Sequence, residues 1–248
     1  MKSRIRFLIA ALLLPAFWCI VKYGLHIADR YLPAPWDVLG AWQAVSPSVL
    51  LHMSVSWLRL LVGYSAGVGI GMAVGIAWWR SRPTFEWSIP SVQALRSIPA
   101  TATVPFFLLW FGFAETGRLL LIVLGISLNV AIAAHQSLEA APEKYRIVRH
   151  SFGLARRDLP IRNFALPVVA ETILPTLRFG LATAIGLVVV SEILGSQIGL
   201  GYLIQTARST FSLHLVFLAA ILFGIINAAS DWMLRHAWNR IVFWRKPT

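Results

Sequence analysis

Long apolar stretches, separated by short polar and basic segments, run through the whole chain. About 20 mostly apolar residues are enough for a helix to cross a bilayer. The pattern therefore predicts an all-α, polytopic membrane protein with about six transmembrane helices and no soluble domain. The predicted spans are residues 5–25, 49–79, 85–112, 119–135, 164–193 and 213–234.

The segments between the spans have different characters. Residues 26–48 mix charged residues, prolines and aromatics, and we expect them outside the membrane or at its surface. Residues 195–212 are punctuated by glycine and only half apolar, which is typical of a short re-entrant or interfacial outer segment. Residues 136–163 form the main polar loop. Prolines interrupt the third span, and such breaks are tolerated where neighbouring helices or a cavity satisfy the freed carbonyls.

Composition supports a membrane protein. The 248 residues are 58% hydrophobic and 13% charged, and the mean hydropathy is +0.71, well above the values of soluble domains. The single cysteine, Cys19, lies in the first span, so the chain has no intrachain disulfide. The basic, apolar N-terminus resembles a signal peptide, but Phe17 and Trp18 make a poor cleavage site before Cys19, and we interpret it as a retained first span.

The net charge of +12 indicates how the chain is oriented in the membrane and does not indicate nucleic-acid binding. Most Lys and Arg residues cluster at the N-terminus, in the turn at Arg80 and Arg82, in the loop 136–163 and in the tail. They form no continuous stripe, which argues against nucleic-acid binding. The positive-inside rule instead predicts a multi-pass protein of the cell (inner) membrane with both termini in the cytoplasm.

Glycine recurs every four residues in the second span, at Gly63, Gly67, Gly71 and Gly75. This spacing puts the four residues on one helical face. Small residues at such positions let two backbones approach closely in lipid. We expect a helix-packing face, with chance enrichment of glycine as the alternative.

The sequence lacks the motifs of several kinds of enzyme. It contains no G-x-x-x-x-G-K-[ST] phosphate loop, no H-E-x-x-H and no Cys/His cluster, and its six histidines are scattered. The chain is therefore predicted not to be an enzyme, to bind no metal and to hold no cofactor of its own.

A few polar residues fall within the apolar stretches, where charged groups are costly and tend to pair or to face a pathway. Arg96, Arg178, Ser191 and Glu192 are the candidates for a pathway. A structural ion pair or hydrogen bond is the alternative for Glu192, and Arg96 can instead extend to the inner headgroups. A second polar group lies close to one face at the outer start of the second span, where packing is the default interpretation; its members are His52, Ser56 and Arg59.

The cytoplasmic segment Tyr145–Pro167 combines a small apolar face with a ring of arginines around Gly153. Glycine allows another backbone to approach closely, and an exposed apolar knob is a common docking element. Two interpretations stay open from this stretch alone: a docking site for another protein, or an ordinary basic loop.

Several motifs together resemble one family. The stretch with Gly153 followed by Leu166-Pro167 is similar to the coupling loop of binding-protein-dependent ABC importer permeases, although Ile147-Val148-Arg149 stands where that family has E-A-A. The run Arg96-Ser-Ile-Pro, Val104-Pro105 and Leu-Trp-Phe-Gly112 resembles the nitrate, sulfonate and taurine subfamily. The histidine-serine-arginine group and Gly199-Leu-Gly201-Tyr202 match the same subfamily in order and spacing.

The resemblance implies a type I ABC importer permease that forms a single transmembrane domain, residues 1–248. An N-terminal span and outer segment, 1–48, would precede a permease core, 49–235, with its coupling segment at 139–163, and a basic cytoplasmic tail, 236–248. The implied ATPase-coupling residues are Arg149, Ser151, Phe152, Gly153, Leu154, Ala155 and Arg156.

The same resemblance implies the partners. These are two cytoplasmic ATPase subunits that bind ATP and Mg²⁺, a solute-binding protein, a second permease copy that makes a homodimer, and membrane lipid. The substrate would be a small anion of the sulfonate, taurine or nitrate type. A heterocyclic vitamin precursor is the alternative within the family. An ATP-independent channel, a secondary transporter and a structural scaffold are alternatives outside it.

Overall fold

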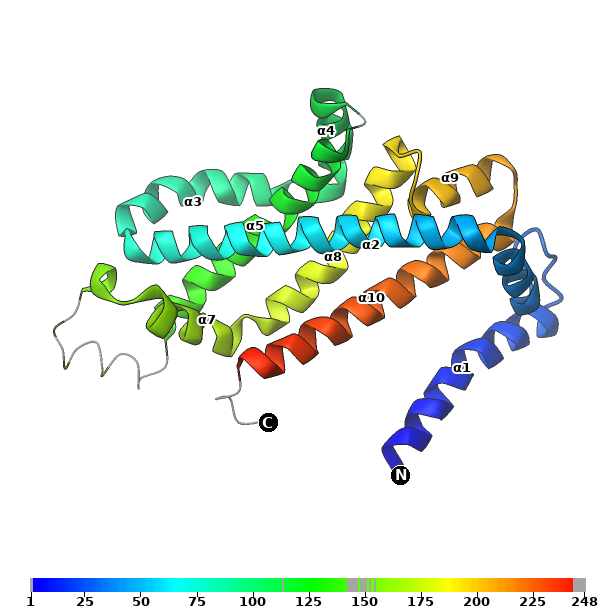
Figure 1. Ribbon diagram of the computed structural model, residues 1–248, viewed down its shortest axis with the longest axis horizontal. Coiled ribbons are helices and arrows are strands. Elements are labelled where there is room, and N and C mark those ends of the chain that lie inside the picture. Colours follow the sequence, from blue (N-terminus) through cyan, green and yellow to red (C-terminus); the bar gives the residue numbers. More distant parts are fainter. Residues whose placement is uncertain are drawn as a thin grey trace.

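The computed structural model describes residues 2–112, 114–141 and 155–242, together with Ile147, Ser151 and Gly153. Across these residues every regular element is a helix or a helical turn (Figure 1). In chain order they are α1 (Lys2–Gly24), α2 (Pro35–Arg80), α3 (Arg82–Ser97), η1 (Ala100–Thr103), α4 (Val104–Phe111), α5 (Glu115–Glu139), η2 (Arg156–Asp158), η3 (Ile161–Ala165), α7 (Leu166–Thr172), α8 (Leu174–Gly195), α9 (Leu200–Ser209) and α10 (Leu213–Ile241).

The long helix α2 crosses one face of a layer formed by α5, α8 and α10, which lie side by side (Figure 1). Helix α3 runs back along α2, and α4 turns away from it. Following the predicted topology, we call the end of the bundle with Glu115 and α9 the outer end, and the end with Arg80 and Glu139 the inner end.

Four described helices are long and apolar enough to cross a membrane: Ser48–Arg80 of α2, α5, α8 and α10. The pair α3 and η1–α4 makes a fifth span if it is counted as one broken crossing. The described apolar part of α1, Leu13–Gly24, is shorter. The fold class predicted from the sequence is confirmed.

Helix α2 begins well before the span predicted at residues 49–79. Pro35 occupies its first turn, where the missing N–H costs nothing. Asp37 accepts a hydrogen bond from the Ala34 amide at 3.1 Å and so caps the N-terminus. The polar composition of residues 35–48 hides this start from a hydropathy pattern, although its capping residues are typical of one.

The third predicted span is broken at a single point. Pro90 lies within α3 without ending it, whereas the chain leaves the helix between Ser97 and Pro99. The two parts meet at 85°. The residue before a proline is driven from the α region, and Ile98 is extended accordingly.

The four glycines of the predicted packing face lie against α5. A Cβ at Gly71 would lie 2.6 Å from the Ser127 carbonyl oxygen and 2.7 Å from the Val130 Cβ, and one at Gly75 would lie 2.7 Å from the Ala134 Cβ. At Gly63 and Gly67 the nearest atoms are the Cβ atoms of Ile122 and Ile126, both at 2.9 Å. The two helices therefore approach at a distance that only glycine permits on α2.

Of the predicted coupling residues, Arg149, Phe152 and Leu154 lie outside the described part of the chain. Ser151 and Gly153 are exposed, and Gly153 has φ +61°, in the left-handed region that favours glycine. A Cβ there would meet nothing within 4 Å, so backbone conformation rather than crowding explains this glycine.

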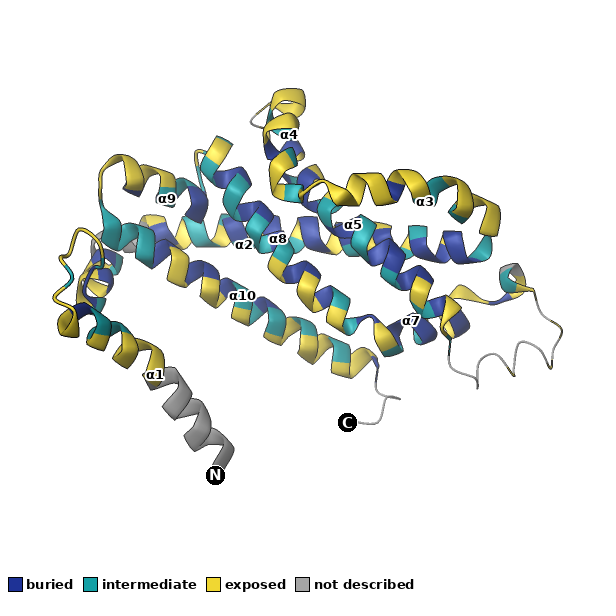
Figure 2. Ribbon diagram, turned by 180° about the vertical axis from the view of Figure 1, so that it is seen from behind, coloured by how far each residue is buried: buried dark blue, intermediate teal, exposed yellow. Residues whose placement is uncertain are grey.

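Burial is concentrated where α2, α5, α8 and α10 meet (Figure 2). Leu60, Ile122, Ile126, Leu187 and Ile226 are almost fully buried there. The outward faces of α3 and α4 expose large apolar side chains, including Trp87, Leu109 and Trp110, as expected of a chain that meets lipid or another membrane subunit.

Candidate functional site

A buried carboxylate, Glu192 near the end of α8, is the centre of a polar cluster at the outer end of the bundle. Its side chain has no exposed surface. Ser56 on α2 donates to it at 2.8 Å, and Arg59, one turn further along α2, donates at 2.7 Å. Charges are buried in this way only when they are paired and hydrogen-bonded.

Arg59 connects three parts of the chain. One terminal nitrogen donates to Glu192 and to the Ile198 carbonyl oxygen, both at 2.7 Å. The Nε and the other terminal nitrogen donate to Glu115, the first residue of α5. A guanidinium offers five donors in a planar fork, so one side chain can tie α2 to α5, α8 and the loop after α8.

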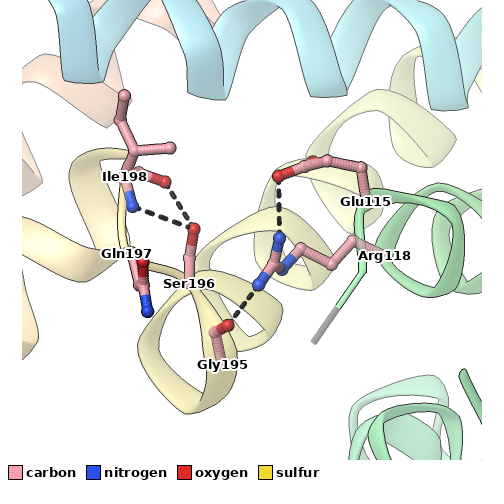
Figure 3. Close-up of a pocket in the computed structure, with 6 residues that line it drawn as sticks. All are labelled: Glu115, Arg118, Gly195, Ser196, Gln197 and Ile198. Atoms are coloured by element: carbon pink, nitrogen blue, oxygen red, sulfur yellow. Dashed lines mark hydrogen bonds and ion pairs between the residues drawn. The ribbon is translucent and has the colours of Figure 1, made fainter. Parts of the chain in front are cut away.

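Glu115 also accepts from Arg118, one turn along α5, at 2.7 Å. Arg118 is buried and donates in addition to the Gly195 carbonyl oxygen. These residues line a cavity of about 530 Å³ together with the loop Ser196–Ile198 (Figure 3). Ser196 closes that loop by donating to the Ile198 carbonyl oxygen and accepting from the Ile198 amide.

The same cluster caps α9 with side chains from other helices. The Gly199 amide donates to Nδ1 of His52 at 2.9 Å, the Leu200 amide to Ser56 Oγ at 2.8 Å, and the Gly201 amide to Glu192 at 2.9 Å. The first amides of a helix have no partner within it. Here three amides in succession are satisfied, two by residues of α2 that are distant in the sequence and one by Glu192 of α8.

Two glycines make this contact possible. A Cβ on Gly201 would lie 2.6 Å from the Glu192 Cβ and 2.8 Å from the Val189 carbonyl oxygen. Gly199 has φ +130°, a conformation that residues with side chains rarely adopt, and its α-carbon faces the Glu192 carboxylate. The motif Gly199-Leu-Gly201 therefore belongs to the same site as His52, Ser56 and Arg59.

The two arginines and two glutamates of this cluster balance in charge. Their donors and acceptors are directed at one another and at backbone groups of Gly195, Ile198 and Gly201. Among the residues that the structure describes, no group of three His, Cys, Asp or Glu could hold a metal ion. Such an arrangement fixes the relative positions of four segments and is not built for acid–base chemistry.

Arg96 lies in a different environment. It is exposed at the end of α3, beside the break, and its Nε donates to the Asn129 side-chain oxygen at 3.1 Å. Asn129 in turn donates to the Gly125 carbonyl oxygen at 3.0 Å. Among the described residues no carboxylate pairs with Arg96. Asn129 lies ten residues from the inner end of α5, or roughly 15 Å along the helix at 1.5 Å per residue.

The other predicted pathway residues lie elsewhere. Arg178 is half-exposed and pairs with Asp231 of α10 through two hydrogen bonds, at 2.7 and 3.2 Å. Ser191 is buried and donates to the Val188 carbonyl oxygen at 3.0 Å. The four predicted pathway residues therefore do not gather into one site, and only Arg96 presents an unpaired charge.

Sequence reasoning missed Glu115, Arg118 and Asn129. Glu115 and Arg118 lie one turn apart, a helix-pair spacing, but they fall between the predicted spans 85–112 and 119–135, where no helix was expected. For Arg59 the spacing with His52 and Ser56 indicated a common face. The identity of its partners on α5 and α8 depends on tertiary packing, which spacing alone does not give.

The model of the family described as "Binding-protein-dependent transport system inner membrane component" matches residues 67–242. The chain belongs to this family. The match covers α5, α8, α9 and α10 and most of the α2 glycine face. The permease is therefore a membrane component of a binding-protein-dependent transport system.

Individual relatives agree with this assignment. SsuC of Bacillus subtilis, named an aliphatic sulfonates transport permease protein, is 30% identical over 240 residues, which are 94% of this chain and 87% of that protein. The taurine transport system permease protein TauC of Escherichia coli is 28% identical over 242 residues, with the same two coverages.

A solved structure matches the fold. A chain from inward-facing conformations of the MetNI methionine ABC transporter superposes with a TM-score of 0.61 at 18% identity, covering 78% of this chain and 97% of that one. This likeness shows that the permease has the type I ABC importer permease fold.

Proposed function

We propose that the permease forms the translocation pathway of an ATP-driven importer for a small sulfonate-type anion such as taurine. The family supports a binding-protein-dependent transporter. The names of the two relatives support the substrate class. The pathway itself is proposed to pass Arg96.

The observation that carries this proposal is the unpaired guanidinium of Arg96 beside Asn129. A charge in the membrane is costly unless it is paired or faces water. The contact with Asn129 supports a position too deep for the side chain to reach the inner headgroups easily. A water-filled pathway that admits anions would satisfy both residues, because a guanidinium binds oxyanions with two parallel hydrogen bonds.

The same proposal includes the partners. Arg96 is exposed on a single chain, so a pathway around it needs a second wall, which a second copy of the permease would supply. Two cytoplasmic ATPase subunits would bind ATP and Mg²⁺, because the sequence has no phosphate loop. The inner end carries Arg80, Arg82 and Arg156, which favours cytoplasmic termini by the positive-inside rule.

The test is uptake into liposomes that contain the permease with its co-purifying ATPase and solute-binding protein. Taurine, ethanesulfonate and nitrate are offered as separate probes. We expect ATP-dependent uptake of at least one sulfonate. Arg96→Ala should lower that uptake roughly 10- to 100-fold, since a hydrogen bond to a charged group is worth about 1.5–3 kcal/mol. Arg96→Lys should keep part of it.

Arg82→Ala is the matched control, because Arg82 is equally basic but pairs with Glu86 at the inner surface. Its uptake should equal that of the unaltered permease. Uptake that needs no ATP would contradict an importer and favour a channel or secondary transporter. Normal sulfonate uptake by Arg96→Ala would remove Arg96 from the pathway.

A further inference from the structure

Arg156 lies at the start of η2, where the chain returns from the predicted coupling segment to the bundle. Both terminal nitrogens of Arg156 donate to the carboxylate of Glu139, the last residue of α5, with 3.0 Å between Nη2 and Oε2. Its guanidinium also lies over the ring of Trp79, 5.9 Å from the centroid. The side chain expected to contact the ATPase is therefore engaged by its own chain.

The inner end of α2 holds the same return segment, residues 155–165, through two further contacts. Arg80 donates to the Leu159 carbonyl oxygen at 2.7 Å. The rings of Trp79 and Phe164 stack at 5.8 Å with 19° between their planes. The return segment is thus attached to the inner ends of α2 and α5 together, by side chains from both helices.

These two helices also share the outer cluster. Glycines of α2 lie in close contact with α5 between the two ends. At the outer end Arg59 of α2 binds both Glu115 of α5 and the Ile198 carbonyl oxygen of the loop after α8. Arg118 of α5 binds the carbonyl oxygen of Gly195, the last residue of α8. The α2–α5 pair therefore connects the coupling segment with the loop Ser196–Ile198 and with the capped start of α9.

We propose that Arg156 is a positioning residue that joins the coupling segment to the α2–α5 pair, so that movement imposed by the ATPase is transmitted to the outer cluster. This inference rests on the proposed function. An exposed ion pair contributes little to stability, and the Arg156 and Glu139 side chains are 35% and 41% exposed. A bidentate pair backed by an aromatic ring fixes geometry instead, which transmission of movement requires.

The test measures the outer end directly. Gln197 is exposed beside the outer cavity, and Gln197→Cys is introduced after Cys19→Ser removes the native thiol. The complex with the co-purified ATPase is placed in lipid nanodiscs. The rate at which a water-soluble maleimide labels position 197 is compared with and without ATP and vanadate.

We expect ATP to change this labelling rate in the otherwise unaltered permease. Arg156→Glu and Glu139→Arg should each reduce the ATP-dependent change by roughly fivefold or more, the scale of a coupling free energy between sites. The double variant Arg156→Glu/Glu139→Arg should restore it, because the ion pair re-forms with its charges exchanged. Thermal unfolding should remain normal in all three, and the labelling rates are compared at equal amounts of co-purified ATPase.

Arg235→Glu supplies the control, since it breaks another partly exposed ion pair, with Asp231 of the same helix α10, that involves neither the return segment nor α5. It should keep the full ATP response. The proposal is overturned if position 197 does not respond to ATP, if Arg156→Glu keeps the response, or if the charge exchange fails to restore it. Failure of the ATPase to co-purify with the unaltered permease would instead contradict the proposed function.

Discussion

At the scale of single residues, the carboxylate of Glu192 depends on Arg59 for its compensation. Removing one partner of a buried ion pair leaves an uncompensated charge and costs about 3–5 kcal/mol. Arg59→Met keeps most of the side-chain volume but removes the charge. We expect the midpoint temperature of thermal unfolding in detergent to fall by roughly 10 °C. Each kcal/mol of lost stability lowers this midpoint by about 2–4 °C in a chain of this size.

The double variant Arg59→Met/Glu192→Gln separates charge from packing. Glutamine can still accept the Gly201 amide, and the uncompensated charge is gone. Its unfolding temperature should lie above that of Arg59→Met alone. A double variant less stable than the single one would mean that the carboxylate contributes through something other than its pairing with Arg59. The exposed pair Arg82–Glu86 gives the comparison, and Arg82→Gln should shift unfolding very little.

Much of this cluster is visible in the sequence as separate fragments. His52, Ser56 and Arg59 share a face, Glu192 is a charge in an apolar stretch, and two glycines precede an amphipathic segment. Nothing in the spacing says that these fragments meet. They do so because α8 and α9 pack against each other and against α2, and a single sequence contains no signal for that approach.

At the scale of elements, the glycine face of α2 determines how closely α5 can pack. We predict that Gly71→Ala destabilises the permease, because the added Cβ would lie 2.6 Å from a carbonyl oxygen of α5. Backbone cannot yield as a flexible side chain does, so the helices must separate and lose contacts along their length. A cost of about 1–3 kcal/mol is typical of overpacking, and it is measured as a lower unfolding temperature in detergent.

Gly69→Ala is the matched control for this prediction. It lies two residues away on the same helix, and its added Cβ would meet nothing within 4 Å. Alanine favours helix over glycine, so this variant should be as stable as the unaltered permease or slightly more so. Equal loss in both variants would show that helix propensity, and not the contact with α5, controls stability at these positions.

Elements were predictable where hydropathy alone defines them, as for α5 and α10. The predicted span 164–193 was wrong at its start, because η3 and the separate helix α7 precede α8, which begins only at Leu174. The early start of α2 was missed because Pro35 and Asp37 mark a helix N-terminus by capping and not by apolarity. The break in the third span was predicted from three prolines, but only Pro99 produces it. Pro105 opens α4 in its first turn, and Pro90 is accommodated within α3.

At the scale of the whole molecule, one pair of helices, α2 and α5, carries three features in a row. These are the Arg156–Glu139 ion pair at the inner end, the glycine face and the outer cluster. If movement passes through these contacts one after another, breaking any one of them stops the movement from reaching the outer end. Contacts that act independently would add their effects, as distant sites usually do for stability. The two cases are distinguished by combining a substitution at the inner end with one in the glycine face.

We therefore predict different behaviour of stability and of coupling in the double variant Arg156→Glu/Gly71→Ala. The decreases in unfolding temperature caused by the two substitutions should add, because the two sites share no contacts. The ATP-dependent labelling of Gln197→Cys should fall no further than in the more affected single variant, because transmission along the pair is already interrupted. If the double variant instead shows a smaller ATP-dependent change in labelling rate than either single variant, the movement is transmitted by separate routes and not through the α2–α5 pair alone.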